Sequence, residues 1–302
     1  MSRFPAFLIA TFLLLECVLC SPRPLVVWHG LGDSAQSAGM LQFADEVKAV
    51  HPGIFVHNVF ISENEDEDKR AGFYGNVNEQ IELVSDQLAA IPELKGGFDA
   101  IGFSQGGQFL RAYIERYNQP PVNNLITFGS QHMGVSDIAA CSPRDFLCQI
   151  ARRAVKGAVY GTWAQNNLVQ AQYFRDPASL EEYLAANHFL PDINNELAET
   201  RNETYARNFA SLNKLVLVKF SKEKTVVPPE SAWFGSQDEA SLYDNQRVLH
   251  QGLSMREQPL YLEDWIGLRK LDERGDVVFE VCEGVHMQIS DCWKGLVQGY
   301  IG

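Results

Sequence analysis

Short apolar runs alternate with longer amphipathic stretches along most of this chain. The apolar runs predict strands at residues 24–28, 54–61, 98–103, 125–129, 215–220 and 277–281. The amphipathic stretches predict helices near residues 37–50, 77–92, 106–117 and 288–299. Strands that are apolar throughout are buried on both faces, so this alternation predicts an α/β fold with helices covering both faces of a parallel sheet.

The alternation lapses after residue 129. Residues 131–214 are mostly helical in pattern, which indicates an insertion within a single domain of residues 21–302. The insertion holds more large apolar side chains than a connection needs. They either form a small core of their own or line an apolar groove at the edge of the sheet, where α/β folds usually bind their ligands.

The first 20 residues form a separate unit. Arg3, the apolar run of residues 6–15 and the small residues Val18 and Cys20 have the pattern of a secretory signal peptide that is cleaved before Ser21. The apolar run falls well short of the ~20 residues that span a bilayer, so we expect no stable membrane anchor.

Composition narrows the class of protein. Hydrophobic residues make up 46% of the 302 residues, which is typical of a globular chain. With 25 basic against 38 acidic side chains the formal charge is −13, so no basic face is available for phosphates and a nucleic-acid partner is excluded. The acidic tract at residues 63–70 lacks the spacing and glycine of an EF-hand, and it is predicted to be a solvated loop.

Cysteine usage and one sequon agree with an oxidising compartment. After the signal peptide four cysteines remain, and three pairings are possible. We favour Cys141 with Cys148 and Cys282 with Cys292, because each nearest-neighbour pair closes a short loop at little ordering cost. No CxxC spacing or histidine cluster supports a metal site. Asn202 begins the glycosylation sequon Asn-Glu-Thr in a polar stretch.

The strongest chemical signal is the pentapeptide Gly-Phe-Ser-Gln-Gly at residues 102–106. It lies directly between a predicted strand and a predicted helix, which is the context of a nucleophile elbow. Glycines at both ends allow a sharp turn that raises the Ser104 hydroxyl above the sheet, and the helix N-terminus behind it supplies free N–H groups. Ser104 is therefore the predicted nucleophile.

A serine nucleophile needs a base and an acid further along the chain. His286 lies just past the last strand in a glycine-containing loop, whereas His250 has no strand before it, so His286 is the predicted base. Glu223 follows the strand at residues 215–220 and is the predicted acid, with Glu230 and Asp238 as fallback carboxylates.

The oxyanion of an acyl-transfer intermediate needs two preorganised N–H donors. The first is predicted to be the backbone N–H of Gln105, which follows the nucleophile. The second is predicted to be the N–H of Leu31, in the glycine-rich loop after the first strand. His29 in the same loop is interpreted as a packed, hydrogen-bonded structural residue.

Taken together, these segments resemble the palmitoyl-protein thioesterases, lysosomal α/β-hydrolases that remove long-chain fatty acyl groups from cysteine. The likeness covers nearly all of the chain after the signal peptide. It is carried by VVWHGLGDS at 26–34, AIGFSQGGQFLRAYIERY at 100–117, GSQHMGV at 129–135, VQAQYFRDP at 169–177, FLPDIN at 189–194, RNETY at 201–205, ESAWFG at 230–235 and VHMQIS at 285–290.

The resemblance implies an α/β-hydrolase fold, with the insertion between the sixth and seventh core strands and an acyl groove between insertion and sheet. It implies Ser104 as nucleophile, His286 as base and the position of Glu223 as acid, with the N–H groups of Leu31 and Gln105 as the oxyanion hole. The family form has aspartate where this chain has Glu223, so the carboxylate lies about one bond length further out.

The resemblance also implies the substrate and the compartment. The substrates would be S-palmitoylated proteins or peptides and other acyl thioesters, hydrolysed without a cofactor or metal. The compartment would be the lysosome or vacuole, reached through the secretory pathway, or the medium. Two other functions stay open at this point: a secreted lipase or carboxylesterase acting on oxygen esters, and a noncatalytic acyl-binding protein.

Overall fold

The computed structural model describes residues 21–137, 157–237 and 252–302. The predicted signal peptide, the Cys141–Cys148 pair, Asp238 and His250 lie outside the described residues. Within them, no helix is both long enough and apolar enough to cross a bilayer.

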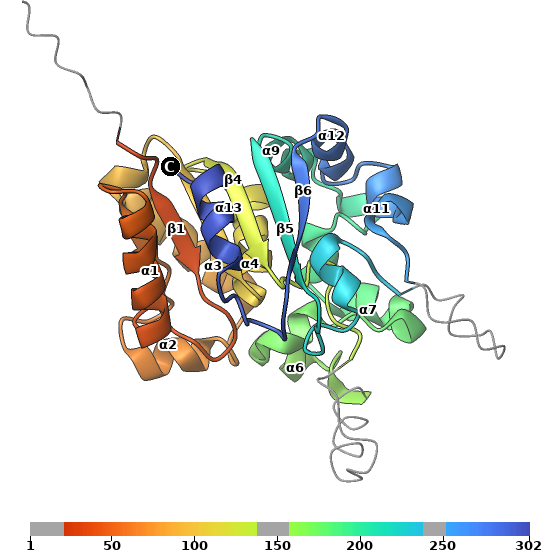
Figure 1. Cartoon of the computed structure of the whole chain (residues 1–302). Coiled ribbons are helices and arrows are strands. Elements are labelled where there is room, and N and C mark those ends of the chain that lie inside the picture. Colours follow the sequence, from red (N-terminus) through yellow and green to blue (C-terminus); the bar gives the residue numbers. More distant parts are fainter. Residues whose placement is uncertain (1–20, 138–156, 238–251) are drawn as a thin grey trace, which may run out of the picture.

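A parallel sheet forms the centre of the molecule, and it confirms the predicted α/β-hydrolase architecture (Figure 1). The six strands of the described chain lie in the order β2-β1-β3-β4-β5-β6, and every neighbouring pair is parallel. Their bounds are β1 Leu25–Trp28, β2 Val56–Asn58, β3 Phe98–Phe103, β4 Val122–Phe128, β5 Lys214–Phe220 and β6 Val277–Cys282. Because all strands run the same way, their carboxyl ends meet at one edge of the sheet.

Two hydrophobic clusters cover the two faces of the sheet. Alternate residues of a strand point to opposite faces, so Val26 joins one cluster while Val27 joins the other. The first cluster packs beneath α3 (Val77–Ala90), α4 (Gln105–Arg116) and α9 (Glu203–Phe209). The second packs beneath α1 (Ala38–Val50) and α13 (Cys292–Tyr300), which lie together on the other face in Figure 1.

The predicted insertion leaves the sheet after β4 and returns at β5. These are the fourth and fifth strands of the described chain in sequence order, where the resemblance counted the sixth and seventh. The described part of the insertion contains α6 Thr162–Asn167, α7 Leu180–Ala186, α8 Leu190–Ile193 and α9, with short 3-10 turns at Val169–Tyr173, Pro177–Ser179 and Ala198–Thr200. In Figure 1 its helices α6 and α7 lie towards the carboxyl ends of the strands, whereas its last helix, α9, lies near the start of β5.

The acidic tract at residues 63–70 was predicted to be a solvated loop, and this is wrong for most of it. Residues Glu65–Ala71 form helix α2, and the side chain of the N-cap Asn64 accepts hydrogen bonds from the N–H groups of Asp66 and Glu67. The acidic side chains stand in the first turn and the basic ones in the last, which favours a helix through its dipole. One carboxylate of the tract, Asp68, is buried.

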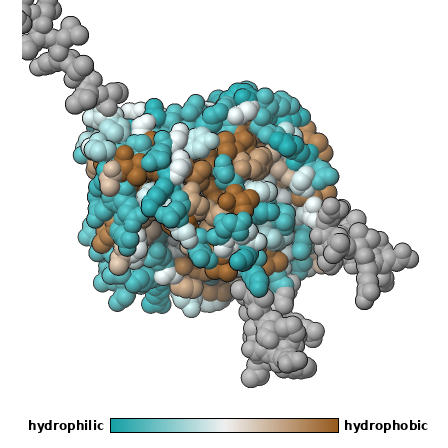
Figure 2. All heavy atoms as spheres, in the orientation of Figure 1, coloured by the Kyte–Doolittle hydropathy of each residue, from teal (hydrophilic) through white to brown (hydrophobic). Residues whose placement is uncertain are grey.

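The last strand, β6, is an edge strand. Residues Val277, Val278 and Phe279 are only partly buried, and Figure 2 shows hydrophobic atoms gathered over β5 and β6 in the middle of this face. The predicted disulfide between Cys282 and Cys292 is present and joins the end of β6 to the start of α13. Two short helices, α11 Pro259–Leu262 and α12 Leu268–Glu273, precede β6.

Candidate active site

The turn between β3 and α4 has the geometry of a nucleophile elbow. Ser104 is held at φ 51° and ψ −120°, a conformation that costs a non-glycine residue about 1–3 kcal/mol. The turn is possible because its flanks are glycines: a Cβ on Gly102 would collide with the backbone of Gly107, and a Cβ on Gly106 with the carbonyl oxygens of Trp28 and His29. The sequence therefore places the Ser104 hydroxyl at the carboxyl edge of the sheet.

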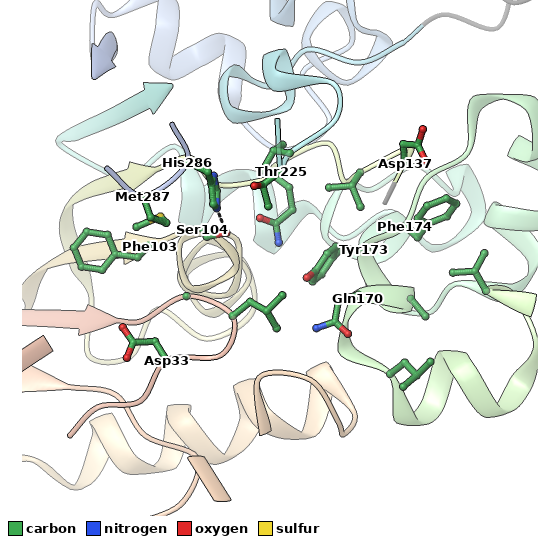
Figure 3. A pocket seen from close by; sticks show the side chains of 18 of the residues that line it. Asp33, Phe103, Ser104, Asp137, Gln170, Tyr173, Phe174, Thr225, His286 and Met287 are labelled. Atoms are coloured by element: carbon green, nitrogen blue, oxygen red, sulfur yellow. Dashed lines mark hydrogen bonds between the residues drawn. The ribbon is translucent and has the colours of Figure 1, made fainter. Parts of the chain in front are cut away.

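The structure brings the predicted serine, histidine and glutamate into one hydrogen-bonded chain. Nε2 of His286 lies 3.0 Å from Oγ of Ser104, and Nδ1 of His286 lies 2.6 Å from Oε2 of Glu223. Figure 3 shows the imidazole pointing at the serine. A carboxylate only accepts hydrogen bonds, so the ring proton lies on Nδ1 and leaves the Nε2 lone pair facing the hydroxyl.

Glu223 is fixed by its own loop. Its Oε1 accepts hydrogen bonds from the backbone N–H groups of Lys224 (2.9 Å), Thr225 (2.7 Å) and Val226 (3.1 Å), which leaves Oε2 for the histidine. Burial alone would raise the pKa of Glu223. The hydrogen bond and charge of His286, with the N–H groups of Thr225 and Val226, outweigh it and lower that pKa below its ordinary value. The carboxylate is therefore kept ionised.

Of the two fallback carboxylates, only Glu230 lies within the described residues. Glu230 sits on the short turn at Pro229–Trp233 and faces Lys219 at 3.7 Å, and its side chain is half exposed. The carboxylate that reaches the imidazole is that of Glu223.

The two predicted oxyanion donors lie on either side of the serine. Gln105 is the first residue of α4, where backbone N–H groups have no partner within the helix. Leu31 follows Gly30, which lies so close to the elbow that a Cβ on it would come within 3.3 Å of the Phe103 oxygen and 3.4 Å of Ser104 Cβ. The Gln105 side chain also bridges the site, donating to the Gly72 oxygen and accepting from the Tyr173 hydroxyl.

A cavity of about 1110 Å³ opens at the serine and is lined mainly by apolar side chains. In Figure 3 Gln170, Tyr173 and Phe174 of the insertion lie on one side of Ser104, and Phe103 and Met287 on the other. The apolar lining comes from α1, the insertion and the loops around Glu223 and His286, and includes Met40, Phe43, Val135, Leu168, Phe174, Val226, Met287 and Ile289. This volume slightly exceeds the range of roughly 300–1,000 Å³ for small-molecule sites.

Sequence analysis missed one buried carboxylate near the site. Asp68 on α2 accepts hydrogen bonds from the N–H groups of Ala35 (2.9 Å) and Ile61 (2.7 Å), and its Oδ2 lies 3.4 Å from Nε2 of His29. The signal was present: an asparagine cap, acids in the next turn and bases after it predict a helix, and the buried face of a helix holds some of its residues.

The remaining predicted sites have clear positions. Asn202 is exposed at the N-cap of α9, where its side chain accepts from the N–H of Thr204, and glycosylation there stays a prediction. The Cys282–Cys292 disulfide closes the loop that carries His286. Among the described ranges, no group of three histidine, cysteine, aspartate or glutamate side chains is arranged to hold a metal ion.

Comparison with known proteins gives one consistent family. A family model described as palmitoyl protein thioesterase matches residues 24–286. The chain is 41% identical to palmitoyl-protein thioesterase 1 of Caenorhabditis elegans, over 88% of this chain and 87% of that protein. It is 32% identical to palmitoyl-protein thioesterase 3 of Dictyostelium discoideum, over 94% and 92% of the two chains.

Less similar proteins include a further thioesterase homolog and, among solved structures, a carboxylesterase. The chain is 29% identical to a Drosophila melanogaster protein named as a homolog of the lysosomal thioesterase PPT2, over 87% of this chain and 85% of that protein. Among solved structures, a carboxylesterase of the thaumarchaeon Nitrososphaera gargenis covers 92% of this chain and 89% of its own, with 13% identity and a TM-score of 0.45. That structural likeness is too weak to bear on function.

Proposed function

This chain belongs to the palmitoyl protein thioesterase family, and on that premise we propose that it hydrolyses long-chain acyl thioesters of protein cysteines through an acyl-enzyme on Ser104. One observation carries the proposal: a hydrogen-bond relay runs from Glu223 through His286 to Ser104 at the wall of an apolar cavity. The enzyme is a thioester hydrolase, and its substrates are acylated proteins.

Acylation starts at the serine hydroxyl. His286 accepts the Oγ proton on Nε2 while Oγ of Ser104 bonds to the thioester carbonyl carbon. The carbonyl oxygen becomes an oxyanion and accepts hydrogen bonds from the N–H groups of Leu31 and Gln105, each contributing about 3–4 kcal/mol to the transition state. The carbon–sulfur bond then breaks. Cysteine leaves as a thiolate with little acid assistance, because an ordinary thiol has a pKa near ~8.5.

Deacylation repeats the steps with water as the nucleophile. The departing thiolate takes the proton from Nε2 of His286, and the freed Nε2 then accepts a proton from water as the water oxygen attacks the acyl carbon. The bond to Oγ breaks, the proton returns to Ser104, and the fatty acid leaves. Glu223 holds the Nδ1 proton in place and offsets the charge of the imidazolium in both halves of the reaction.

The proposed binding site for the acyl chain is the cavity beside Ser104. Its lining is mainly apolar, and burying one methylene of an acyl chain there contributes about 0.8 kcal/mol. Residues 131–214 supply much of the wall beside Ser104, which supports the reading of the insertion as the element that forms the acyl groove.

Three features of the chain bear on the compartment in which the protein acts. The predicted signal peptide, the disulfide at Cys282 and the exposed sequon at Asn202 favour passage through the secretory pathway. A relative is named a lysosomal thioesterase, and we propose the lysosome as the destination.

A chain-length series with a nucleophile control tests the proposal. Purified protein and Ser104→Ala are assayed on acyl-CoA thioesters of increasing length. We expect kcat/KM to rise up to about 4-fold per methylene until the cavity is filled, and Ser104→Ala to lose at least about 1000-fold. A fluorophosphonate probe should label wild type and not Ser104→Ala.

Matched oxygen esters decide between thioester and oxoester hydrolysis. Palmitoyl thioesters and palmitoyl oxoesters are compared on the same preparation. A strong preference for the oxoester would make the protein a lipase or carboxylesterase. Tight palmitate binding without labelling of Ser104 would make it a noncatalytic acyl-binding protein.

A further inference from the structure

A buried histidine and a buried carboxylate lie close together beside the loop that carries Leu31. His29 follows the end of β1, and Asp68 lies on α2; both side chains are almost fully buried, at 3% and 2% exposed. Nε2 of His29 lies 3.4 Å from Oδ2 of Asp68. The mechanism above uses neither residue. Burying two ionisable groups is costly unless they are paired, so their presence beside the site calls for a reason.

Each ring nitrogen of His29 faces an acceptor. Nδ1 lies 3.0 Å from the carbonyl oxygen of Gly30, and Nε2 faces the Asp68 carboxylate. The Gly30 carbonyl can only accept, so Nδ1 donates to it, whereas Nε2 is buried without a hydrogen bond and faces the carboxylate at 3.4 Å. Burial alone would raise the pKa of Asp68, but the contact with His29 and the N–H groups of Ala35 and Ile61 lower it, which keeps the carboxylate charged.

The carbonyl that His29 holds belongs to the same peptide unit as the N–H of Leu31. A trans peptide is planar, so its C=O and N–H point in opposite directions. Fixing the Gly30 oxygen towards His29 therefore fixes the direction of the Leu31 N–H. The N–H of Asp33 donates to the same oxygen at 3.3 Å and closes the turn. The Gly30 backbone lies against the elbow, close to Ser104 Cβ.

We propose that His29, held by Asp68, is a positioning residue that orients the Gly30–Leu31 peptide so that the Leu31 N–H faces the oxyanion. The inference rests on the proposed function, because it assigns a role within the oxyanion hole. The hydrogen bond from Nδ1 to the Gly30 oxygen polarises the peptide and strengthens its N–H as a donor. The acidic tract on α2 thus serves the site through Asp68.

The test compares His29→Ala, His29→Asn, Asp68→Asn and the double variant His29→Ala with Asp68→Asn, all on palmitoyl-CoA. Asparagine at 29 keeps a donor near the position of Nδ1 but cannot reach Asp68. Asp66→Asn is the matched control, because it makes the same change on the exposed side of the same helix.

We expect His29→Ala to lower kcat by about 30-fold or more, and Asp68→Asn by about 10-fold, with KM changed less than about 2-fold, since an oxyanion contact acts in the transition state. His29→Asn should recover part of the loss. In the double variant Asp68→Asn should add nothing to His29→Ala, because Asp68 acts through the histidine. Asp66→Asn should match wild type.

Several results would overturn the inference. These are multiplied losses in the double variant, an unchanged kcat in His29→Ala, or a loss confined to KM. Thermal unfolding checks the fold of each variant. A measurement on wild type needs no variant fold: nitrogen NMR of the His29 ring should show a proton on Nδ1, which faces the Gly30 oxygen, and a ring with no proton on Nδ1 would also overturn the inference. If wild type itself does not hydrolyse palmitoyl-CoA, the proposed function fails instead.

Discussion

Glu223 and His286 are joined by a 2.6 Å hydrogen bond although 63 residues separate them in the chain. The glutamate makes this contact with one oxygen while the other accepts three backbone N–H groups of its own loop. The glutamate of this chain thus makes both the contact with the imidazole and the contacts with its own loop. Both carboxylate oxygens of Glu223 have hydrogen-bond partners. Replacing either oxygen therefore changes the contact with His286 or the contacts with the loop.

The substitution Glu223→Gln should keep the fold and lower kcat at least about 100-fold. If the amide oxygen keeps the three loop N–H groups, its NH₂ faces Nδ1 of His286 and donates to it. The ring proton then moves to Nε2, which can no longer accept the proton of Ser104. Steady-state kinetics on palmitoyl-CoA measures the loss. Glu230→Gln is the control and should stay near wild type; the opposite pattern would move the acid to Glu230.

The elbow glycines should tolerate no side chain. In Gly106→Ala the new methyl group meets the carbonyl oxygens of Trp28 and His29, and we expect a loss of about 3 kcal/mol in the free energy of unfolding. Gly295→Ala is the matched control, because nothing lies within 4 Å of its added Cβ in α13. That change should stabilise the protein by about 0.5–1 kcal/mol. Urea denaturation measures both, and equal effects at the two positions would contradict the steric argument.

The Cys282–Cys292 disulfide should stabilise both the fold and the site. Replacing both cysteines by alanine removes the link across the loop that carries His286, and we expect a cost of about 2–3 kcal/mol. The imidazole should also lose its fixed position, so kcat should fall more than KM rises. Calorimetry and kinetics on the double variant check this. A variant with unchanged stability and kcat would show that the loop is held by its other contacts.

Glu115 should make the protein less stable as the pH rises. Burial raises the pKa of this fully buried carboxyl to about 8, against the opposing charges of Arg111 and Arg116. Between its ordinary value of 4.5 and about 8 the folded protein keeps a proton that the unfolded chain has released. The folded state binds more protons, so the free energy of unfolding falls as pH increases through this window.

Glu115→Gln removes this dependence. Its melting temperature relative to wild type should rise by at least about 2–4 °C between pH 5 and pH 8, which corresponds to about 1 kcal/mol. Glu93→Gln, the same change at an exposed position, should show a constant difference. A difference for Glu115→Gln that does not vary with pH would mean that the carboxyl is already ionised in the fold.

The local part of this protein could be read from its sequence. The strand at residues 98–103 and the helix at residues 77–90 lie close to where periodicity placed them, because burial on a sheet or a helix face imposes a repeat on neighbouring residues. The elbow at Ser104 could also be predicted, because its pentapeptide lies between a predicted strand and a predicted helix. Chain order then reduced the bases to His250 and His286 and the acids to a few carboxylates, and the position of His286 just past the last strand favoured it.

What remained was decided by residues that meet only in the folded chain. Sequence could rank Glu223 above Glu230, but only the sheet brings the end of β5 next to the loop after β6. From the sequence, Asp68 was predicted to be one more exposed acid of a solvated tract, because the burial of one carboxylate does not change the charge pattern of that tract. His29 likewise meets Asp68 only through a segment distant in sequence, and the cavity gains its walls in the same way. Periodicity records which face of an element is buried, whereas a site depends on distances between elements, and these arise only when the elements pack.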